Sequence, residues 1–320
     1  MDQWNEKRAL LTECEAKIRE SIIGMEDIVS QLLMVMLSGG NILLEGMPGL
    51  GKTKLVQTVG KVFDLESKRI QFTPDLMPQD ITGTTIFMRS GDENTFTFRK
   101  GPVFANLILA DEINRATPKT QSAMLEAMQE GTVTEGGVTY PLPKPFFVLA
   151  TQNPIETEGT YPLPEAQLDR FLCKLNLKFP KSEELKKILY LTEYQEKEKK
   201  TEEDKTICRK EDLLEMMEMV SGIQVADPVM DHLVRIMAAT HEKNPYIRVG
   251  ASPRGAQAIL RLAKAKAFIE GRFNISFEDV RYAAYPALRH RIVLSFDALT
   301  EGISSDEVIR RILESCPVSR

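Results

Sequence analysis

Residues 46–53 read GMPGLGKT and match the phosphate-loop pattern G-x-x-x-x-G-K-[ST]. An apolar run at residues 42–44 comes directly before them, and a helical pattern runs from Lys52 towards Phe63 directly after them. Glycines let the backbone N–H groups of such a loop turn inward around phosphate oxygens, and the helix N-terminus adds partial positive charge. A strand, this loop and a helix in that order predict a nucleotide-binding α/β fold.

The loop predicts ATP or ADP with Mg²⁺ as cofactors. Lys52 would reach the β- and γ-phosphates, and the hydroxyl of Thr53 would bind Mg²⁺. The predicted nucleotide contacts within and beside the loop are Gly46, Pro48, Gly49, Leu50, Gly51, Lys52, Thr53 and Lys54.

Four further segments are predicted to be the remaining strands of a sheet, and the third strand, at residues 107–110, is fully apolar. They cover residues 69–72, 107–110, 146–150 and 175–177, and helical patterns alternate with strands along this part of the chain. Such alternation indicates a doubly wound α/β domain, so we expect a five-stranded parallel sheet. Residues 1–40 are also predicted to be helical, because their apolar residues recur at helical spacing.

Two segments interrupt this alternation. Residues 84–99 have β-rich arms around Ser-Gly-Asp-Glu-Asn, and residues 132–140 have such arms around Gly136-Gly137. Each pattern predicts a β-hairpin, and neither hairpin is needed to build the sheet. We interpret both as surface insertions, which carry partner contacts or only decorate a fold.

The C-terminal part of the chain has a different pattern. Residues 195–205 carry alternating charges and almost no apolar side chain, which predicts a solvated linker or an exposed helix end. Helical patterns then cover residues 209–221, 228–241, 252–270, 276–288 and 304–315. We therefore expect an α/β nucleotide-binding domain over residues 1–184 and an all-helical domain over residues 185–320.

Two carboxylates follow the apolar run at residues 107–110. They belong to Asp111 and Glu112, and carboxylates at the end of a buried strand are costly unless a cation or a water needs them. Asp111 is predicted to hold Mg²⁺ and Glu112 to polarise the attacking water, which favours hydrolysis over transfer to a small substrate. The alternative is a strand end that is simply exposed to solvent.

Asn153 follows the apolar run at residues 146–150. The carboxyl ends of central strands face the crevice in which a nucleotide binds. The Asn153 amide could orient a water there without changing the charge. The alternative is that Asn153 caps a turn with Pro154.

Three arginines are candidates for phosphate contacts. Arg170 precedes the last strand and could act as an arginine finger in the neighbouring subunit's site, or pair with Asp169 or another carboxylate of its own chain. Arg254 falls in the first turn of a helix predicted to begin at Ser252-Pro253. A positive charge at a helix N-terminus is unfavourable, and a nearby anion would offset it. Arg254 is therefore predicted to contact the γ-phosphate. The alternative is that its side chain is simply exposed. Arg115 could bridge to a neighbouring nucleotide or pair with an acidic residue.

Composition limits the class of partner. The 320 residues include 41 Lys+Arg and 46 Asp+Glu, for a formal net charge of −5, whereas duplex-binding domains usually carry a basic excess. Nucleic acid is therefore a disfavoured partner.

The four cysteines form no CxxC pair, and with three histidines they give no zinc-ligand spacing. The charged N-terminus lacks a signal-peptide core and no apolar stretch is long enough to span a bilayer, so we expect a cytoplasmic protein.

These motifs, in this order, resemble the AAA+ ATPases and within them the MoxR subgroup. The resemblance covers nearly the whole chain, and its clearest parts are GPVFANLILADEINRATPKTQSAMLEAMQEGTVT, FFVLATQNPIETEGTYPLPEAQLDRFL, GASPRGAQAILRLAKAKAFIEGR and FEDVRYAAYPALRHRIVL. It implies a P-loop NTPase core with two hairpin insertions and a helical lid. It also implies that Ile23 and Gly24, before the phosphate loop, touch adenine.

The resemblance implies a ring, commonly a hexamer, with ATP at subunit boundaries. In such a ring Arg170 would serve the next subunit, and the subunit's own nucleotide would be served by Lys52, Thr53, Asp111, Glu112, Asn153 and Arg254. The resemblance further implies chaperone-like, ATP-driven remodelling or maturation of protein complexes, often with a partner that carries a von Willebrand factor A domain. The chain has no distinct aromatic pore-loop motif of the unfoldase type, which counts against threading of a polypeptide.

Other functions fit parts of the pattern. A nucleotide-controlled scaffold with negligible hydrolysis would need neither Glu112 nor Arg170. A DNA-dependent AAA+ motor would use a basic hairpin, whereas residues 132–140 contain Glu135 and no Lys or Arg. A small-molecule kinase would need a substrate pocket in place of the helical lid.

Overall fold

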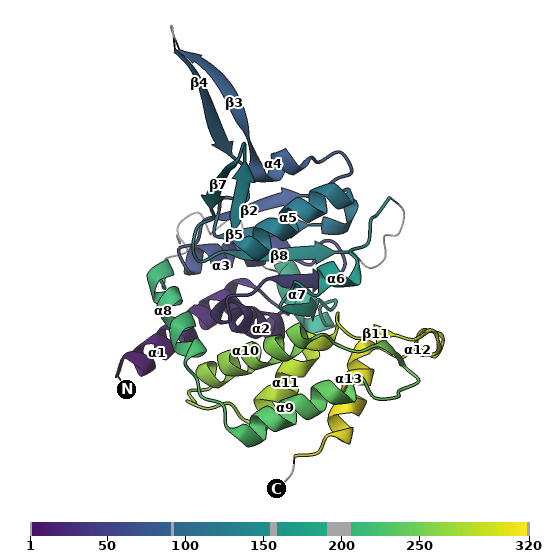
Figure 1. Cartoon of the computed structure of the whole chain (residues 1–320). Coiled ribbons are helices and arrows are strands. Elements are labelled where there is room, and N and C mark those ends of the chain that lie inside the picture. The colour runs from purple at the N-terminus through teal and green to yellow at the C-terminus, as the bar shows by residue number, and fades with distance from the viewer. Residues whose placement is uncertain (1, 91–92, 154–158, 191–205, 319–320) are drawn as a thin grey trace.

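A five-stranded sheet forms the centre of the upper part of the molecule (Figure 1). The computed structural model describes residues 2–90, 93–153, 159–190 and 206–318. The strands, in sheet order, are β2 (Ser67–Gln71), β5 (Leu107–Asp111), β8 (Phe147–Gln152), β1 (Ile42–Glu45) and β9 (Cys173–Asn176). All neighbours pair in parallel, which confirms the predicted five-stranded parallel sheet.

The register of the sheet brings polar residues to one edge. Glu45 at the end of β1 pairs with Gln152 of β8, and Gln71 at the end of β2 pairs with Asp111 of β5. Since parallel strands share one direction, their carboxyl ends form a single edge of the sheet. The phosphate loop begins at this edge, directly after Glu45.

Alternate residues of the strands face two apolar cores. Ile42 and Leu44 of β1 belong to a core with residues of α1 (Asp2–Ser21), α2 (Glu26–Leu37) and α3 (Lys52–Val62). Leu43 belongs to a second core with residues of α5 (Pro118–Glu130). This is the period-two alternation of a strand. Because helices cover both faces, the central strands are apolar on both sides.

Both predicted hairpins are confirmed. After α4 (Pro78–Thr82), β3 (Gly83–Ser90) pairs antiparallel with β4 (Glu93–Lys100), and β6 (Thr132–Glu135) pairs with β7 (Val138–Pro141). The β3–β4 hairpin projects away from the body of the molecule (Figure 1). Phe98 of β4 stacks on Tyr140 of β7 with ring centroids 4.3 Å apart, so the two insertions touch near their bases. The predicted turn residues Gly91 and Asp92 lie outside the described residues.

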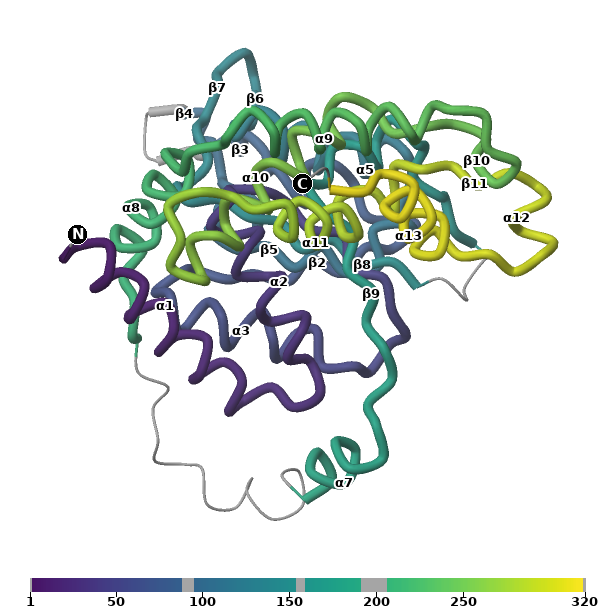
Figure 2. Tube along the Cα trace, turned by 90° about the horizontal axis from the view of Figure 1, so that it is seen from below, coloured from purple at the N-terminus to yellow at the C-terminus, as the bar shows by residue number. Residues whose placement is uncertain are grey.

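The C-terminal part is helical, as expected, and lies below the sheet (Figures 1 and 2). Its helices are α8 (Lys210–Ser221), α9 (Asp227–Ala239), α10 (Pro253–Ile269), α11 (Phe277–Leu288), α12 (Phe296–Thr300) and α13 (Ser305–Ser315), with a small antiparallel pair of β10 (Ile247–Val249) and β11 (Val293–Leu294). The core that contains α1, α2 and α3 continues into α8, α9, α10, α11 and α13. The sheet and the helical part therefore share one apolar core.

Short elements connect these parts. They are the 3-10 turn η1 (Ile113–Arg115), α6 (Glu165–Leu168) and α7 (Ser182–Tyr190). The expected domain boundary between residues 184 and 185 falls within α7 and stays a prediction. The predicted linker at residues 195–205 lies outside the described residues. Over the part of the chain that the structure describes, no helix is both long enough and apolar enough to cross a bilayer.

His232 of α9 is a buried polar residue that couples stability to pH. Its ring packs edge-on against Phe277 with centroids 5.3 Å apart, and neither ring nitrogen has a hydrogen-bond partner among the described residues. Burial, together with the positive charges of Arg235 and Arg281, lowers the pKa of His232 below its ordinary value. The unfolded chain therefore takes up the proton more readily than the folded protein.

We expect the free energy of unfolding to be unaffected by His232 above about pH 6.5 and to fall below it, by up to about 1.4 kcal/mol per pH unit until the folded pKa is reached. Urea unfolding at pH 7.5 and at pH 5 measures this loss. His232→Leu should reduce the loss without abolishing it, because burial also lowers the pKa of His290. An unchanged loss in His232→Leu would contradict the assignment to His232.

Candidate active site

The phosphate loop connects β1 to α3. Gly49 and Gly51 have φ values of +82° and +80°, and Gly51 is the N-cap of α3. Glycine adopts this left-handed region without a steric cost, whereas other residues avoid it. The N–H groups of a first helical turn have no partner within the helix, so they can bind phosphate oxygens. The predicted loop contacts at residues 46–54 lie in this turn and in the start of α3.

Lys52 is the first residue of α3, and its side chain reaches back to the start of the loop. Its side chain is buried, and its Nζ donates a hydrogen bond to the carbonyl of Gly46 at 3.2 Å. Burial lowers the pKa of Lys52, and the carboxylates of Asp111 and Glu112 oppose that shift. The structure therefore brings Lys52 into the electrostatic neighbourhood of both predicted carboxylates.

Asp111 ends β5, and protein donors hold both of its oxygens. Thr151 donates to Oδ1 at 2.7 Å, and Arg69 donates to Oδ2 from Nε at 3.1 Å and from Nη2 at 2.7 Å. The Arg69 side chain is about half exposed, so it can move away without opening the core. The Asp111 carboxylate and the Thr53 hydroxyl are hard oxygen donors of the kind that suit Mg²⁺, which usually keeps waters and phosphate oxygens as its other ligands.

Glu112 has an unusual backbone conformation. Its φ is +57°, and its N–H donates to Thr151 Oγ1 at 2.8 Å. Backbone strain of this kind at a residue other than glycine persists only where surrounding contacts enforce it, and it is common at active sites. Here the contact with Thr151 fixes the backbone that aims the Glu112 side chain.

Two side chains hold the Glu112 carboxylate. Gln71 Nε2 donates to Oε2 at 2.8 Å, and Arg115 Nη1 donates to the same oxygen at 3.0 Å. For Arg115, the structure shows the second of the two alternatives, an ion pair with an acidic residue of its own chain. No motif in the sequence points to Gln71 or Thr151, although each is a polar residue at the carboxyl end of a predicted strand.

Asn153 directly follows β8 and is buried. Because β8 lies between β5 and β1 in the sheet, its carboxyl end lies between Asp111 and the phosphate loop. This is the position from which an amide can reach a water near the terminal phosphate. Pro154, the partner in the alternative turn, lies outside the described residues.

Ile23 and Gly24 lie in the turn between α1 and α2. Gly24 has a φ of +76°, and a Cβ added there would lie 3.1 Å from Glu184 of α7. The next residue, Met25, reaches the phosphate loop, since a Cβ added at Gly51 would lie 3.6 Å from its Cε. The turn predicted to touch adenine is therefore a neighbour of the phosphate loop.

Arg170 and Arg254 form a second group, away from the loop. Both line a cavity of about 280 Å³ together with Gly40 and Asn41, which precede β1. Gly40 and Gly46 flank β1 and lie about 20 Å apart, because a strand rises about 3.3 Å per residue. The cavity is thus at the amino end of β1, and the phosphate loop is at its carboxyl end.

This placement corrects the expectation for Arg254. The sequence predicts that it contacts the γ-phosphate of its own subunit, whereas α10 packs on α2 and α11 below the sheet and places Arg254 in the cavity that Arg170 also lines. For Arg170, the alternative of an ion pair with Asp169 is also not found, since the Asp169 carboxylate pairs with Arg291 at 2.7 Å. Arg170 Nη1 instead donates weakly to the carbonyl of Leu125 at 3.5 Å.

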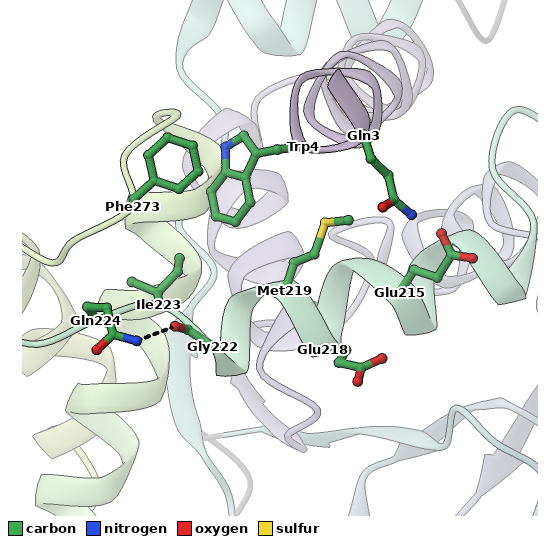
Figure 3. Close-up of a pocket in the computed structure, with 9 residues that line it drawn as sticks. All are labelled: Gln3, Trp4, Glu215, Glu218, Met219, Gly222, Ile223, Gln224 and Phe273. Carbon is green, nitrogen blue, oxygen red and sulfur yellow. Dashed lines mark hydrogen bonds between the residues drawn. The ribbon is translucent and has the colours of Figure 1, made fainter. Parts of the chain in front are cut away.

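A separate cavity of about 380 Å³ lies between α1, α8 and the turn before α11 (Figure 3). Trp4, Met219 and Phe273 form its apolar wall. Glu215, which also lines it, pairs with Lys7 at 2.6 Å. Neither the phosphate loop nor the two strand-end carboxylates line this cavity, so it is not part of the candidate active site.

Two family models match parts of the chain. The model of the "ATPase family associated with various cellular activities (AAA)" matches residues 41–173, and that of the "AAA lid domain" matches residues 239–312. The chain is 43% identical to "Chaperone MoxR1" of Mycobacterium tuberculosis, over 93% of this chain and 80% of that protein. It is 27% identical to "Protein MoxR" of Methylorubrum extorquens, over 95% of this chain and 93% of that protein.

A solved structure shows the same architecture. The crystal structure of a candidate ATPase from Cytophaga hutchinsonii, at 2.00 Å resolution, matches with a TM-score of 0.90 and 39% sequence identity. The match covers 100% of this chain and 98% of that one. The helical part below the sheet is therefore included in the likeness, together with the sheet.

Proposed function

The chain belongs to the MoxR subgroup of the AAA+ ATPases, and from this premise we propose that it hydrolyses ATP in a ring of identical subunits, in order to remodel or mature a protein client. The ring is proposed to be a hexamer with ATP at each boundary. The free and buried state of the four cysteines fits the cytoplasmic location that we propose.

One observation supports the proposed ring: the residues of the proposed ATP site lie at two opposite ends of β1. The phosphate loop and the strand-end carboxylates lie at one end, and the arginine-lined cavity lies at the other. An arginine side chain is far shorter than the distance between them. A subunit's own Arg170 and Arg254 therefore serve a phosphate outside their own chain, and a head-to-tail ring supplies one at each interface.

In the proposed reaction Lys52 binds the β- and γ-phosphates, and Thr53 and Asp111 hold Mg²⁺. The metal, when bound, supplies neutralisation of phosphate charge. Glu112 accepts a proton from the attacking water and Asn153 orients that water. Gln71 and Arg115 both donate to Glu112 Oε2, so they hold the carboxylate in place and leave Oε1 able to accept that proton.

The arginines of the preceding subunit complete the proposed site. Charge builds up on the γ-phosphate oxygens during transfer, and a guanidinium placed there stabilises it. Arg170 and Arg254 lie in one cavity, so a neighbour's γ-phosphate can meet both at once. This replaces the expectation that Arg254 serves its own subunit.

A protein is the proposed client, and a von Willebrand factor A domain protein is one candidate partner. Phe87 and Phe96 are exposed and face each other across the projecting β3–β4 hairpin, with ring centroids 5.3 Å apart. Exposed aromatic pairs of this kind suit protein contacts. A nucleic-acid client is disfavoured, because the formal net charge is −5 and the β6–β7 hairpin carries no Lys or Arg.

ATP turnover per subunit is expected to depend on protein concentration. Since each site needs a neighbour's arginines, dilution below the dissociation constant of the ring should lower turnover by at least about 10²-fold. Phosphate release measured across a dilution series, beside sedimentation of the same samples, tests this. Constant turnover in samples that sediment as monomers would contradict the shared site.

A further inference from the structure

We propose that Arg291 and Asp169 are positioning residues that fix Arg170 and Arg254 at one spacing for the neighbour's phosphate. This inference rests on the shared site proposed above. Neither residue touches nucleotide in the proposal: both act through the two arginines.

Arg291 follows α11, and its guanidinium is almost completely buried, with its side chain 3% exposed. Its Nε donates to Asp169 Oδ1 at 2.7 Å. Its Nη2 donates to the carbonyls of Asp169 at 3.0 Å and Phe171 at 2.6 Å, and its Nη1 donates to those of Leu172 at 3.1 Å and Ala287 at 2.5 Å. All five N–H groups of the guanidinium are thus used, and four of them bind the turn that contains Arg170.

Asp169 connects that turn to the start of α10. Its two carboxylate oxygens accept hydrogen bonds from the Ser252 hydroxyl at 2.9 and 2.8 Å. Ser252 is the N-cap of α10, and Arg254 is in the first turn of the same helix. One carboxylate therefore joins the residue before Arg170 to the helix end that carries Arg254.

The flanking residues strengthen this connection. His290 Nε2 lies 3.1 Å from the carbonyl of Phe171, within hydrogen-bond distance. Arg289 Nη1 donates to the carbonyl of Lys174 at 3.3 Å. The segment that follows α11 thus holds the backbone between Arg170 and β9 over several residues. A turn held by this many bonds has one conformation, so the Arg170 side chain starts from a fixed base.

A buried lysine could not replace this contact. Lysine keeps the charge, but it has three donors on one nitrogen and lacks the planar fork that reaches several carbonyls at once. In Arg291→Lys the turn loses most of its bonds, and the two arginines lose their common spacing. Since a misplacement of about 1 Å can cost about 10²-fold in rate, kcat should fall by about 10- to 100-fold while KM for ATP stays within about 2-fold.

Mixed rings test whether the damage lies on the arginine side of the interface. Glu112→Gln subunits have an inactive loop and intact arginines, so they can complete the loop of an Arg291→Lys neighbour. Equal mixing should restore about a quarter of wild-type turnover, the share of interfaces with that order in a random head-to-tail ring. Mixing Arg291→Lys with Arg170→Ala should restore nothing, since both lack a working arginine side.

Two further variants keep the test decisive. Arg281→Lys is the matched control, because Arg281 is a partly buried arginine of α11 that donates to the carbonyl of Leu313 in α13 at 2.8 Å, and its kcat should stay within about 2-fold of wild type. Asp169→Asn removes the carboxylate at constant size and should reproduce Arg291→Lys if the latter fails to fold. Thermal unfolding identifies such a failure.

The outcomes separate the two proposals. Suppose that rings mixed from Arg170→Ala and Glu112→Gln subunits regain turnover, but rings mixed from Arg291→Lys and Glu112→Gln subunits do not. Arg291 then has only a structural role, and the inference is overturned. A wild-type kcat in both Arg291→Lys and Asp169→Asn overturns it as well. If the Arg170→Ala mixture fails to regain turnover, the shared site itself is wrong and the inference falls with it.

Discussion

Glu112→Gln is expected to lower ATP turnover by about 10²- to 10⁴-fold while ATP stays bound. The amide has the size of the carboxylate but cannot accept a proton from water. Glu112 lies after β5, opposite the phosphate loop, and its backbone is fixed by Thr151. Phosphate release and equilibrium binding of labelled ATP, measured on the same sample, check both halves of this expectation.

Glu126→Gln is a matched control, because Glu126 is an exposed residue of α5. Its turnover should equal that of the wild type. If Glu112→Gln also hydrolysed ATP at the wild-type rate, the enzyme assignment would fail, and the nucleotide-controlled scaffold would be the better interpretation. With hydrolysis blocked, the same variant should hold ATP and client together, so affinity capture with it is the direct route to the client.

Arg170→Ala is expected to abolish measurable turnover, with a loss of about 10³- to 10⁵-fold, and to leave the affinity for ATP nearly unchanged. Arg170 lines the cavity at the amino end of β1, away from its own phosphate loop. In the proposed ring the substitution therefore removes a charge from the neighbour's site and leaves the binding loop of its own subunit intact. Single-turnover kinetics and ATP titration measure the two effects separately.

Arg310→Ala serves as the control for loss of an arginine charge, because Arg310 is an exposed residue of α13 that pairs with Glu307 and Glu314. It should change neither quantity. Loss of ATP binding in Arg170→Ala would mean that Arg170 supports its own subunit's fold or loop. Normal turnover would mean that charge on the γ-phosphate is stabilised by another residue.

The sheet and the phosphate loop could be predicted because their signals are local. A buried parallel strand is an apolar run, and the loop needs glycines at positions such as Gly49 and Gly51, whose φ values are positive. The hairpins were predicted for the same reason, since β-rich arms and a turn lie next to each other in the chain. Asp111 and Glu112 followed directly from the end of such a strand.

The position of Arg254 could not be predicted in this way. It depends on how α10 packs below the sheet, and on the contact of Ser252 with Asp169, which is 83 residues away in the sequence. The hydrogen bond from Gln71 to Glu112 likewise joins residues that are far apart in the sequence, separated by 41 positions. Local pattern predicts which residues carry charge or amide groups, whereas tertiary packing decides which of them meet.

The predicted helix at residues 1–40 was also wrong in one respect, because the turn at Gly24 divides it into α1 and α2.

Strand β1 has four residues, and its two ends border two different sites. In the proposed ring, one end holds the subunit's own nucleotide and the other faces the nucleotide of the next subunit. A short, fully paired strand changes its length very little. Its length therefore sets how far the phosphate loop lies from the arginine cavity of the same subunit. We expect that a shift of one bound nucleotide moves the whole subunit and so reaches the next nucleotide. Neighbouring sites in the proposed ring should therefore not hydrolyse ATP independently of one another.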